Sequence, residues 1–195
     1  MNEIRNLLEN ALAKATAKRD AGESDREIHR NRSQNLVDQI ARGFQTRFGA
    51  NPAVRVFWSR NASNQSDFNR KEFLFDIAVC EVKETPSATG RALLHFVTKT
   101  HWIVESEFEP NSRDAIVDMS KLVMGNSENV LFIGSAVGPK DGYLDMLGKV
   151  AKHCSGHTYL ALIEHPSKWK PHTPKPEVYS WAGQEWSPMG PSVRQ

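Results

Sequence analysis

The apolar run from Asn129 to Val137, NVLFIGSAV, is the segment that most restricts how this chain can fold. It is nearly continuous in apolar residues, which is typical of a strand that is buried on both faces of a sheet. Amphipathic helical patterns flank this run on both sides, in residues 112–125 and 140–154, and another strand-like run follows in 158–164. Strands that alternate with helices in this way indicate β-α-β crossovers and a parallel section of sheet.

The first half of the chain adds two helices and three strands. Residues 2–20 repeat apolar side chains at helical spacing, and Ser24 with Glu27 forms a capping box for a second helix that ends near Gly49. Strand-like segments follow in residues 53–58, 72–82 and 91–109, with turn residues between the last two. The order predicts an α/β (α+β) fold: a mixed β-sheet with an α-β-β-β-α-β core flanked by helices.

The C-terminal part of the chain differs in composition from the rest. Residues 166–195 contain six of the ten prolines, together with Trp169, Trp181 and Trp186. We therefore predict one domain over residues 1–165, with the first helix as an extension, and a Pro/Trp-rich tail over 166–195. The segment EVYSWAG predicts an edge strand within this tail. Its tryptophans suit packing against the sheet or against a second subunit, which leaves a homodimer open, or stacking on bases.

Composition places few limits on the function. The chain of 195 residues is 39% hydrophobic, which is enough for a sizeable core, and its net charge of +2 neither requires nor excludes a nucleic-acid partner. Two cysteines cannot form a disulfide framework, which favours a reducing compartment. We find no signal-peptide pattern and no apolar stretch long enough to cross a bilayer. We expect a cytoplasmic protein that does not associate with membranes.

Acidic residues interrupt two of the predicted strands. Asp76 lies within EFLFDIAVCEV, where a charge needs a partner, hydrogen bonds or a metal. In HWIVESEFEP, Glu105, Glu107 and Glu109 alternate and therefore share one face of a strand. If the two strands pair as an antiparallel hairpin with Asp76 opposite Glu105, three carboxylates converge at one edge of the sheet. Residues 84–97 then require a bulge, a short helix or an extension of both strands.

This convergence of carboxylates has a specific chemical use. Oxygen ligands from two or three carboxylates suit Mg²⁺, which can activate water and stabilise charge on a phosphoryl group. On the following helix, Asp114, Asp118 and Lys121 recur on one face, so Lys121 is placed to orient water or neutralise charge. Two alternatives need no metal: a solvated ladder of salt bridges on that helix, and a solvated edge strand in an unrelated α/β protein.

The pattern resembles the restriction-endonuclease-like, or PD-(D/E)xK, nuclease superfamily, and its uncharacterised bacterial members in particular. The resemblance covers residues 24–163 and rests on Asp76, on the ESE stretch that contains Glu105 and Glu107, and on the element order. It implies a Mg²⁺- or Mn²⁺-dependent nuclease that hydrolyses phosphodiester bonds in nucleic acid, with DNA as the first expectation. It assigns the metal to Asp76 and Glu105.

Two departures from the family pattern matter. Phe75 replaces the usual proline, and Glu107 replaces the usual lysine. The resemblance then implies that Glu107 completes the metal shell or acts as a base, and that Lys121 takes over the role of the lysine. An acidic residue on the preceding helix sometimes completes such sites, and Glu27 and Asp38 are the candidates here. The same departures also fit a catalytically inactive relative that binds nucleic acid or a protein partner.

Overall fold

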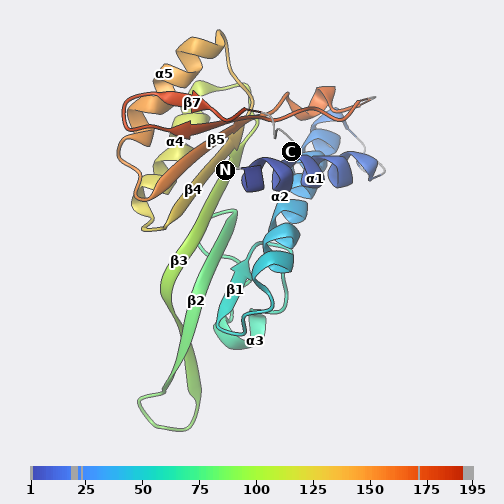
Figure 1. Cartoon of the computed structure of the whole chain (residues 1–195). Coiled ribbons are helices and arrows are strands. Elements are labelled where there is room, and N and C mark those ends of the chain that lie inside the picture. The colour runs from blue at the N-terminus through green and yellow to red at the C-terminus, as the bar shows by residue number, and fades with distance from the viewer. Residues whose placement is uncertain (1, 19–21, 23, 171, 191–195) are drawn as a thin grey trace.

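The structure is a computed structural model, and it describes residues 2–18, 22, 24–170 and 172–190 (Figure 1). The helices are α1 (Asn2–Ala17), α2 (Asp25–Phe48), α3 (Gln65–Phe68), α4 (Ser112–Met124) and α5 (Lys140–Ala151), with a 3-10 turn η1 (Pro166–Lys168). The strands are β1 (Val54–Phe57), β2 (Ile77–Pro86), β3 (Leu93–Glu107), β4 (Asn129–Gly134), β5 (His157–Leu162), β6 (Glu177–Trp181) and β7 (Trp186–Pro188).

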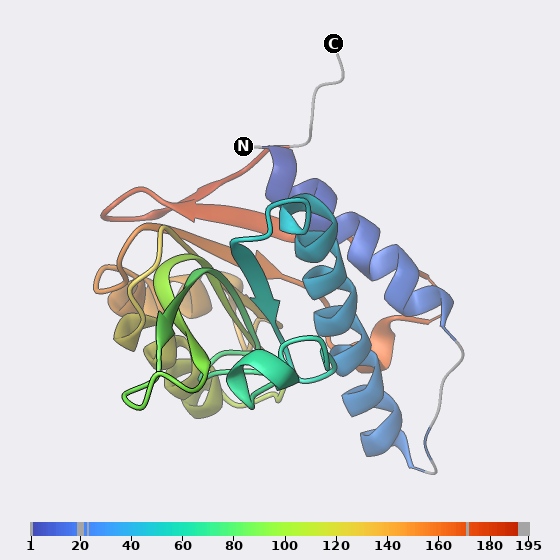
Figure 2. The same ribbon diagram turned by 90° about the horizontal axis from the view of Figure 1, so that it is seen from below.

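In the described part of the chain, seven strands form one mixed sheet, in the order β1 to β7. The pairs β3/β4 and β4/β5 are parallel and are connected through α4 and α5, whereas the other pairs are antiparallel. Figure 2 shows α1 and α2 on one side of the sheet and α4 and α5 on the other. The predicted α+β class, with a mixed sheet flanked by helices, is confirmed.

The capping box predicted at the start of α2 is present. The Ser24 side chain accepts a hydrogen bond from the backbone N–H of Glu27, and the Glu27 carboxylate accepts one from the backbone N–H of Ser24 at 3.1 Å. These bonds satisfy N–H groups that have no partner within the helix, and a cap of this kind stabilises by about 1 kcal/mol. At the other end, the N–H of Gly49 donates to Gln45, so the helix ends where the sequence predicts.

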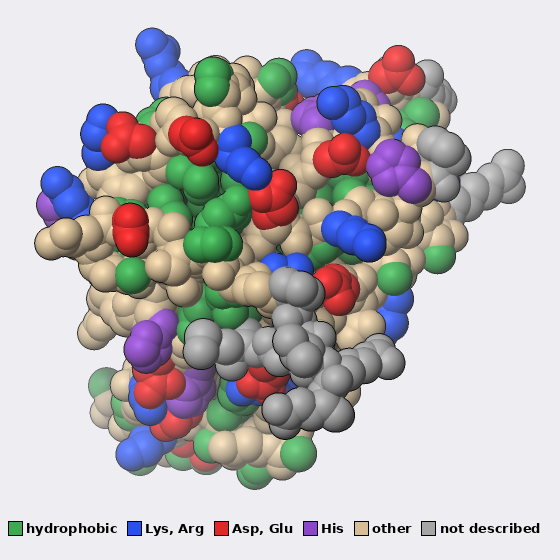
Figure 3. Space-filling model, turned by 45° about the horizontal axis from the view of Figure 1, so that its top comes forward, with side chains coloured by type: hydrophobic (Ala, Val, Ile, Leu, Met, Phe, Trp, Pro, Cys, Tyr) green, Lys and Arg blue, Asp and Glu red, His purple; other side chains and the backbone are tan. Residues whose placement is uncertain are grey.

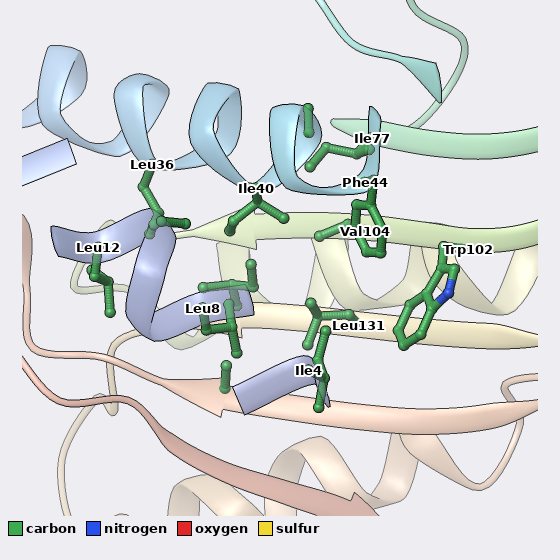
Figure 4. Packing of buried hydrophobic residues seen from close by; sticks show 14 of the residues in the cluster. Ile4, Leu8, Leu12, Leu36, Ile40, Phe44, Ile77, Trp102, Val104 and Leu131 are labelled. Carbon is green, nitrogen blue, oxygen red and sulfur yellow. The ribbon is translucent and has the colours of Figure 1, made fainter. Parts of the chain in front are cut away.

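The larger core lies between the α1/α2 pair and one face of the sheet. Figure 4 shows Leu36, Ile40 and Phe44 of α2 directed toward the strands. All three are fully buried, and α1 adds a buried row at helical spacing: Ile4, Leu8 and Leu12. The sheet contributes apolar side chains from three strands: Ile77, Val104 and Leu131. Because α1 fills this core, the predicted N-terminal extension is integral to the packing.

A second core lies on the opposite face of the sheet, under α4 and α5. Met119 and Leu147 supply its helical side, and Ile103 and Phe132 supply its strand side. The adjacent residues Ile103 and Val104 therefore belong to different cores, as strand alternation requires. The same alternation directs the next odd-numbered residue of β3, Glu105, toward α4.

The β2–β3 hairpin begins in the predicted register and then departs from it. Ile77 pairs with Val104, and this register continues to place Asp76 across from Glu105. Two register shifts follow, between Val79 and Cys80 and between Glu81 and Val82. Beyond them the two strands remain paired as far as Pro86 and Leu93, so residues 84–97 are not a plain loop or a helix. Of the three alternatives expected there, the structure shows an extension of both strands, and the pairing between them is irregular. The hairpin projects from the body of the molecule (Figure 1).

The predicted strand at 72–82 is wrong at its start and too short at its end. The strand begins at Ile77 and continues to Pro86, and the turn residues are confined to 87–92. Residues 72–76 leave the ladder because their groups have other partners. Phe73 packs against Phe57 at a ring-centroid distance of 4.5 Å, and Asp76 is engaged by the end of β3. Asp76 therefore precedes β2 and does not interrupt it.

The tail completes the sheet. The strand predicted in EVYSWAG is confirmed as β6, but β7 pairs on its outer side, so β6 is not the edge. Trp169 is fully buried in the larger core, while Trp181 and Trp186 pack against α5. Of the three uses expected for the tail tryptophans, the contacts in the structure are packing within the chain. Residues 191–195 lie outside the described residues.

Both cysteines, Cys80 and Cys154, are free thiols. Among the helices in the described ranges, none combines the length and the apolar character needed to cross a membrane.

Candidate carboxylate site at the end of β3

Asp76 is fixed against the end of β3 by Ser106. Its Oδ2 atom accepts two hydrogen bonds from this residue, one from the backbone N–H at 2.9 Å and one from the hydroxyl at 2.6 Å. Burial raises the pKa of Asp76, and the two bonds from Ser106 work in the opposite direction because they favour the charged form. The carboxylate is thus held in one position beside the next acidic residue of β3.

Glu105 is the most deeply buried acid of the site, with only 2% of its surface exposed. Its Oε1 atom accepts a hydrogen bond from the backbone N–H of Asp76 at 3.3 Å, and its Oε2 atom lies 3.2 Å from Nζ of Lys121. Burial and then the charge of Asp76 raise the pKa of Glu105 to about 8, despite the nearby ammonium group. Two carboxylates that share a buried position in this way cannot both ionise without a large cost.

Lys121 supplies the positive charge next to these carboxylates. Its Nζ atom also contacts Oδ1 of Asp118, one turn earlier on α4, at 2.7 Å. Burial alone would lower the pKa of Lys121, but the hydrogen bond to Asp118 and the charge of Glu105 outweigh it and raise the pKa. The side chain therefore remains an ammonium ion. Asp114, the other acid of the predicted helix face, instead accepts a hydrogen bond from Asn111 at 3.1 Å.

Glu107 lies at the outer end of the site. Its Oε1 atom accepts a hydrogen bond from the backbone N–H of Glu109 at 2.6 Å. Burial raises the pKa of Glu107 to about 7; the bond from Glu109 opposes this rise, and a hydrogen bond with Asp118 adds to it. The hydroxyl of Tyr143 is buried beneath this end of β3 and has no hydrogen-bond partner among the described residues. Burial, with a smaller effect of Glu107, raises the pKa of Tyr143 to about 12.

The structure thus brings together the four residues singled out in the sequence: Asp76, Glu105, Glu107 and Lys121. It also adds two that sequence reasoning did not assign to the site, Ser106 and Asp118. Alternation along the strand gives no reason to connect Ser106 with an acid, because its side chain belongs to the other face and its contact with Asp76 appears only in the structure. Asp118 is spaced at i, i+3 from Lys121, and this spacing could have indicated it.

The two acids proposed from the preceding helix have structural partners. Asp38 is buried and accepts hydrogen bonds from Nε1 of Trp58 at 3.0 Å and from Nε of Arg42 at 3.1 Å. Glu27 belongs to the capping box of α2. Neither arrangement depends on a metal ion.

The donor types at this site suit a divalent cation, but the site is not a three-carboxylate cage. Within the described ranges, no group of three or more His, Cys, Asp and Glu side chains is arranged to hold a metal ion. Mg²⁺, however, is usually held by one or two carboxylates together with waters and phosphate oxygens. Asp76 and Glu105 form such a pair, and the ammonium group of Lys121 already holds a positive charge beside it.

Comparisons with models of known protein families, with curated proteins and with solved structures gave no match. The case for any function of this chain therefore rests on its own residues and their geometry.

Proposed function

We propose that this protein hydrolyses phosphodiester bonds in nucleic acid with the help of Mg²⁺ or Mn²⁺, and that DNA is the first substrate to test. The observation behind this proposal is the burial of Glu105 beside Asp76 at the end of β3, with Lys121 within 3.2 Å. A buried pair of acids with raised pKa values is costly to maintain, and such costs concentrate at functional sites.

In this proposal Asp76 and Glu105 hold the metal. When bound, the ion supplies charge stabilisation at the phosphoryl group and lowers the pKa of a bound water. Ser106 keeps the Asp76 carboxylate in place through its two hydrogen bonds. Lys121, released from Glu105, neutralises charge that develops on the phosphate oxygens. Glu107 lies at the solvent side of the pair, and with a pKa of about 7 it can accept a proton from water near neutral pH.

The decisive experiment is a cleavage assay with labelled single-stranded DNA, duplex DNA and RNA, in Mg²⁺, in Mn²⁺ and in EDTA. Asp76→Asn, Glu105→Gln and Lys121→Met should each abolish metal-dependent cleavage. Asp145→Asn is the matched control, because Asp145 lies on the exposed surface of α5 and pairs only with Lys149 among the described residues. Cleavage that persists in EDTA, or that survives Asp76→Asn, would contradict the proposal.

A second candidate is a protein of similar architecture that binds nucleic acid or a protein partner without turnover. The observation that favours it is the internal neutralisation of the site, in which Lys121 contacts both Glu105 at 3.2 Å and Asp118 at 2.7 Å. Calorimetric titration with Mn²⁺ separates the two candidates. The hydrolytic site should take up Mn²⁺ in the wild type and lose that uptake in Glu105→Gln, whereas the binding protein should show no uptake in either.

A further inference from the structure

A cleft of about 750 Å³ adjoins the carboxylate site on the α1/α2 side of the sheet. One wall is the start of α2, with Arg26, His29 and Arg30; the other is the segment that follows β3, with Glu107 and Glu109. Figure 1 shows the start of α2 beside η1, close to the point where β3 ends. We call this hollow the α2 cleft. Ser106 and Glu107 line it, so the cleft borders the outer end of the carboxylate site.

The α2 wall of the cleft carries Arg26 and Arg30 together with the capping acid Glu27, and the charged side chains of the opposite wall are acidic. Arg26 and Arg30 are exposed, and neither side chain forms an ion pair or hydrogen bond with another residue in the described part of the chain. Arg42, farther along the same helix, is by contrast paired with Asp38 at 3.1 Å. Figure 3, in which the top of Figure 1 comes forward, shows acidic, basic and histidine side chains next to one another on this side of the molecule.

Two histidines, His29 and His165, also line the cleft. The rings of His29 and His165 meet edge to face at a centroid distance of 5.4 Å. Burial, and then the neighbouring His29, lower the pKa of His165. The cleft's permanent positive charge comes from the two arginines, because a guanidinium group stays protonated at any physiological pH.

We infer that Arg26 and Arg30 bind the phosphate backbone of a nucleic-acid strand in the α2 cleft and so deliver the strand to the carboxylate site. Guanidinium groups suit phosphate because they donate paired hydrogen bonds and remain charged. The i, i+4 spacing places the two side chains on one helix face, with about 5–6 Å between their Cβ atoms, which suits neighbouring phosphates of one strand. The opposite wall carries Glu107, which borders the carboxylate site that would receive the scissile phosphate.

This inference rests on the proposed function for the identity of the anion, but it can be tested without catalysis. Binding of labelled oligonucleotides is measured by fluorescence anisotropy in EDTA, where metal-dependent cleavage cannot proceed, over a range of salt concentrations. The double variant Arg26→Ala/Arg30→Ala is compared with the wild type and with Lys149→Ala/Lys152→Ala, a variant at two exposed cations at the end of α5 that also removes two positive charges. Both positions on α2 are exposed, so circular dichroism should show an unchanged fold.

The arginine variant should bind about tenfold or more weakly at 0.1 M salt. Its slope of log affinity against log salt should fall by about 1.4 for a single strand or about 1.8 for a duplex, since two phosphate contacts are lost. The lysine variant should bind as the wild type does, and Arg26→Lys/Arg30→Lys should recover most of the affinity, since charge is retained.

The outcomes separate this inference from the proposed function. Arginine-dependent binding by a protein that cleaves nothing supports the cleft and removes the hydrolytic proposal. If the protein shows metal-dependent cleavage but the arginine variant binds nucleic acid with the same affinity and salt slope as the wild type, the inference about the arginines is overturned. The hydrolytic proposal then stands. Absence of any binding to DNA or RNA by the wild type overturns the inference. A loss of affinity for the single strand alone or for the duplex alone supports it and identifies the form that enters the cleft.

Discussion

Replacing Glu105 with glutamine should make the metal-free protein more stable at alkaline pH. Burial and the neighbouring Asp76 raise the pKa of Glu105 from 4.5 to about 8, so the folded protein favours the protonated acid. A carboxyl group with a raised pKa contributes stability below pH 4.5, and that contribution is lost progressively as the pH rises to about 8. Over this interval the free energy of unfolding falls by about 1.4 kcal/mol per pH unit, so Glu105 can lower it by at most about 5 kcal/mol.

The assay is urea unfolding of the wild type and Glu105→Gln from pH 5 to pH 9 in EDTA. The two proteins should agree within about 1 kcal/mol at pH 5, and the variant should be about 2–5 kcal/mol more stable at pH 8 and above. The loss of the bond to Lys121 offsets part of the gain. Glu107, whose pKa is about 7, titrates in both proteins, so its contribution cancels in the difference.

Glu128→Gln is the matched control for this measurement. Hydrogen bonds from Lys99 and His101 lower the pKa of Glu128, which is the opposite sign, so its replacement should leave stability unchanged or slightly reduced at pH 8. If the wild type and Glu105→Gln lose stability in parallel as the pH rises, Glu105 does not titrate in this interval. The buried-acid explanation of the site would then be refuted.

Three further predictions concern the fold and are checked by urea unfolding at pH 7. Gly156→Ala should destabilise the protein by more than about 1 kcal/mol, because Gly156 has φ +69° and an added Cβ would lie 2.2 Å from the carbonyl oxygen of Ser127. Gly90→Ala should destabilise it less, because Gly90 has a similar φ of +67° but an added Cβ would meet no atom within 4 Å. Ser24→Ala should cost about 1 kcal/mol through loss of the α2 cap. Phe44→Ala should cost about 3–5 kcal/mol, because it empties a fully buried position. Equal effects of the two glycine substitutions, or a neutral Phe44→Ala, would contradict the packing described.

Much of the fold follows from local patterns. The capping box at Ser24, the apolar spacing of α2 and the buried strand within 129–137 each depend on neighbours within a few residues, so the sequence predicts them, although the strand ends at Gly134. The irregular pairing of the β2–β3 hairpin does not, because a register shift depends on which backbone groups meet across two strands. The strand β7 is only three residues long, which is too short for alternation to be recognised.

For the candidate site, the sequence alone predicted that Glu105 and Glu107 share a strand face and that Lys121 lies on the polar face of the next helix. Glu109, predicted on the same strand face, lies beyond the end of β3. Periodicity of 2 and of 3.6 residues fixes such faces wherever the element lies. Only the tertiary structure decided that α4 packs over the end of β3, which brings Asp118 and Lys121 to Glu105. It alone placed Ser106 against Asp76 and the start of α2 across from Glu107. These contacts join segments far apart in the chain, and their distances follow from how helices pack on a sheet, which no local pattern encodes.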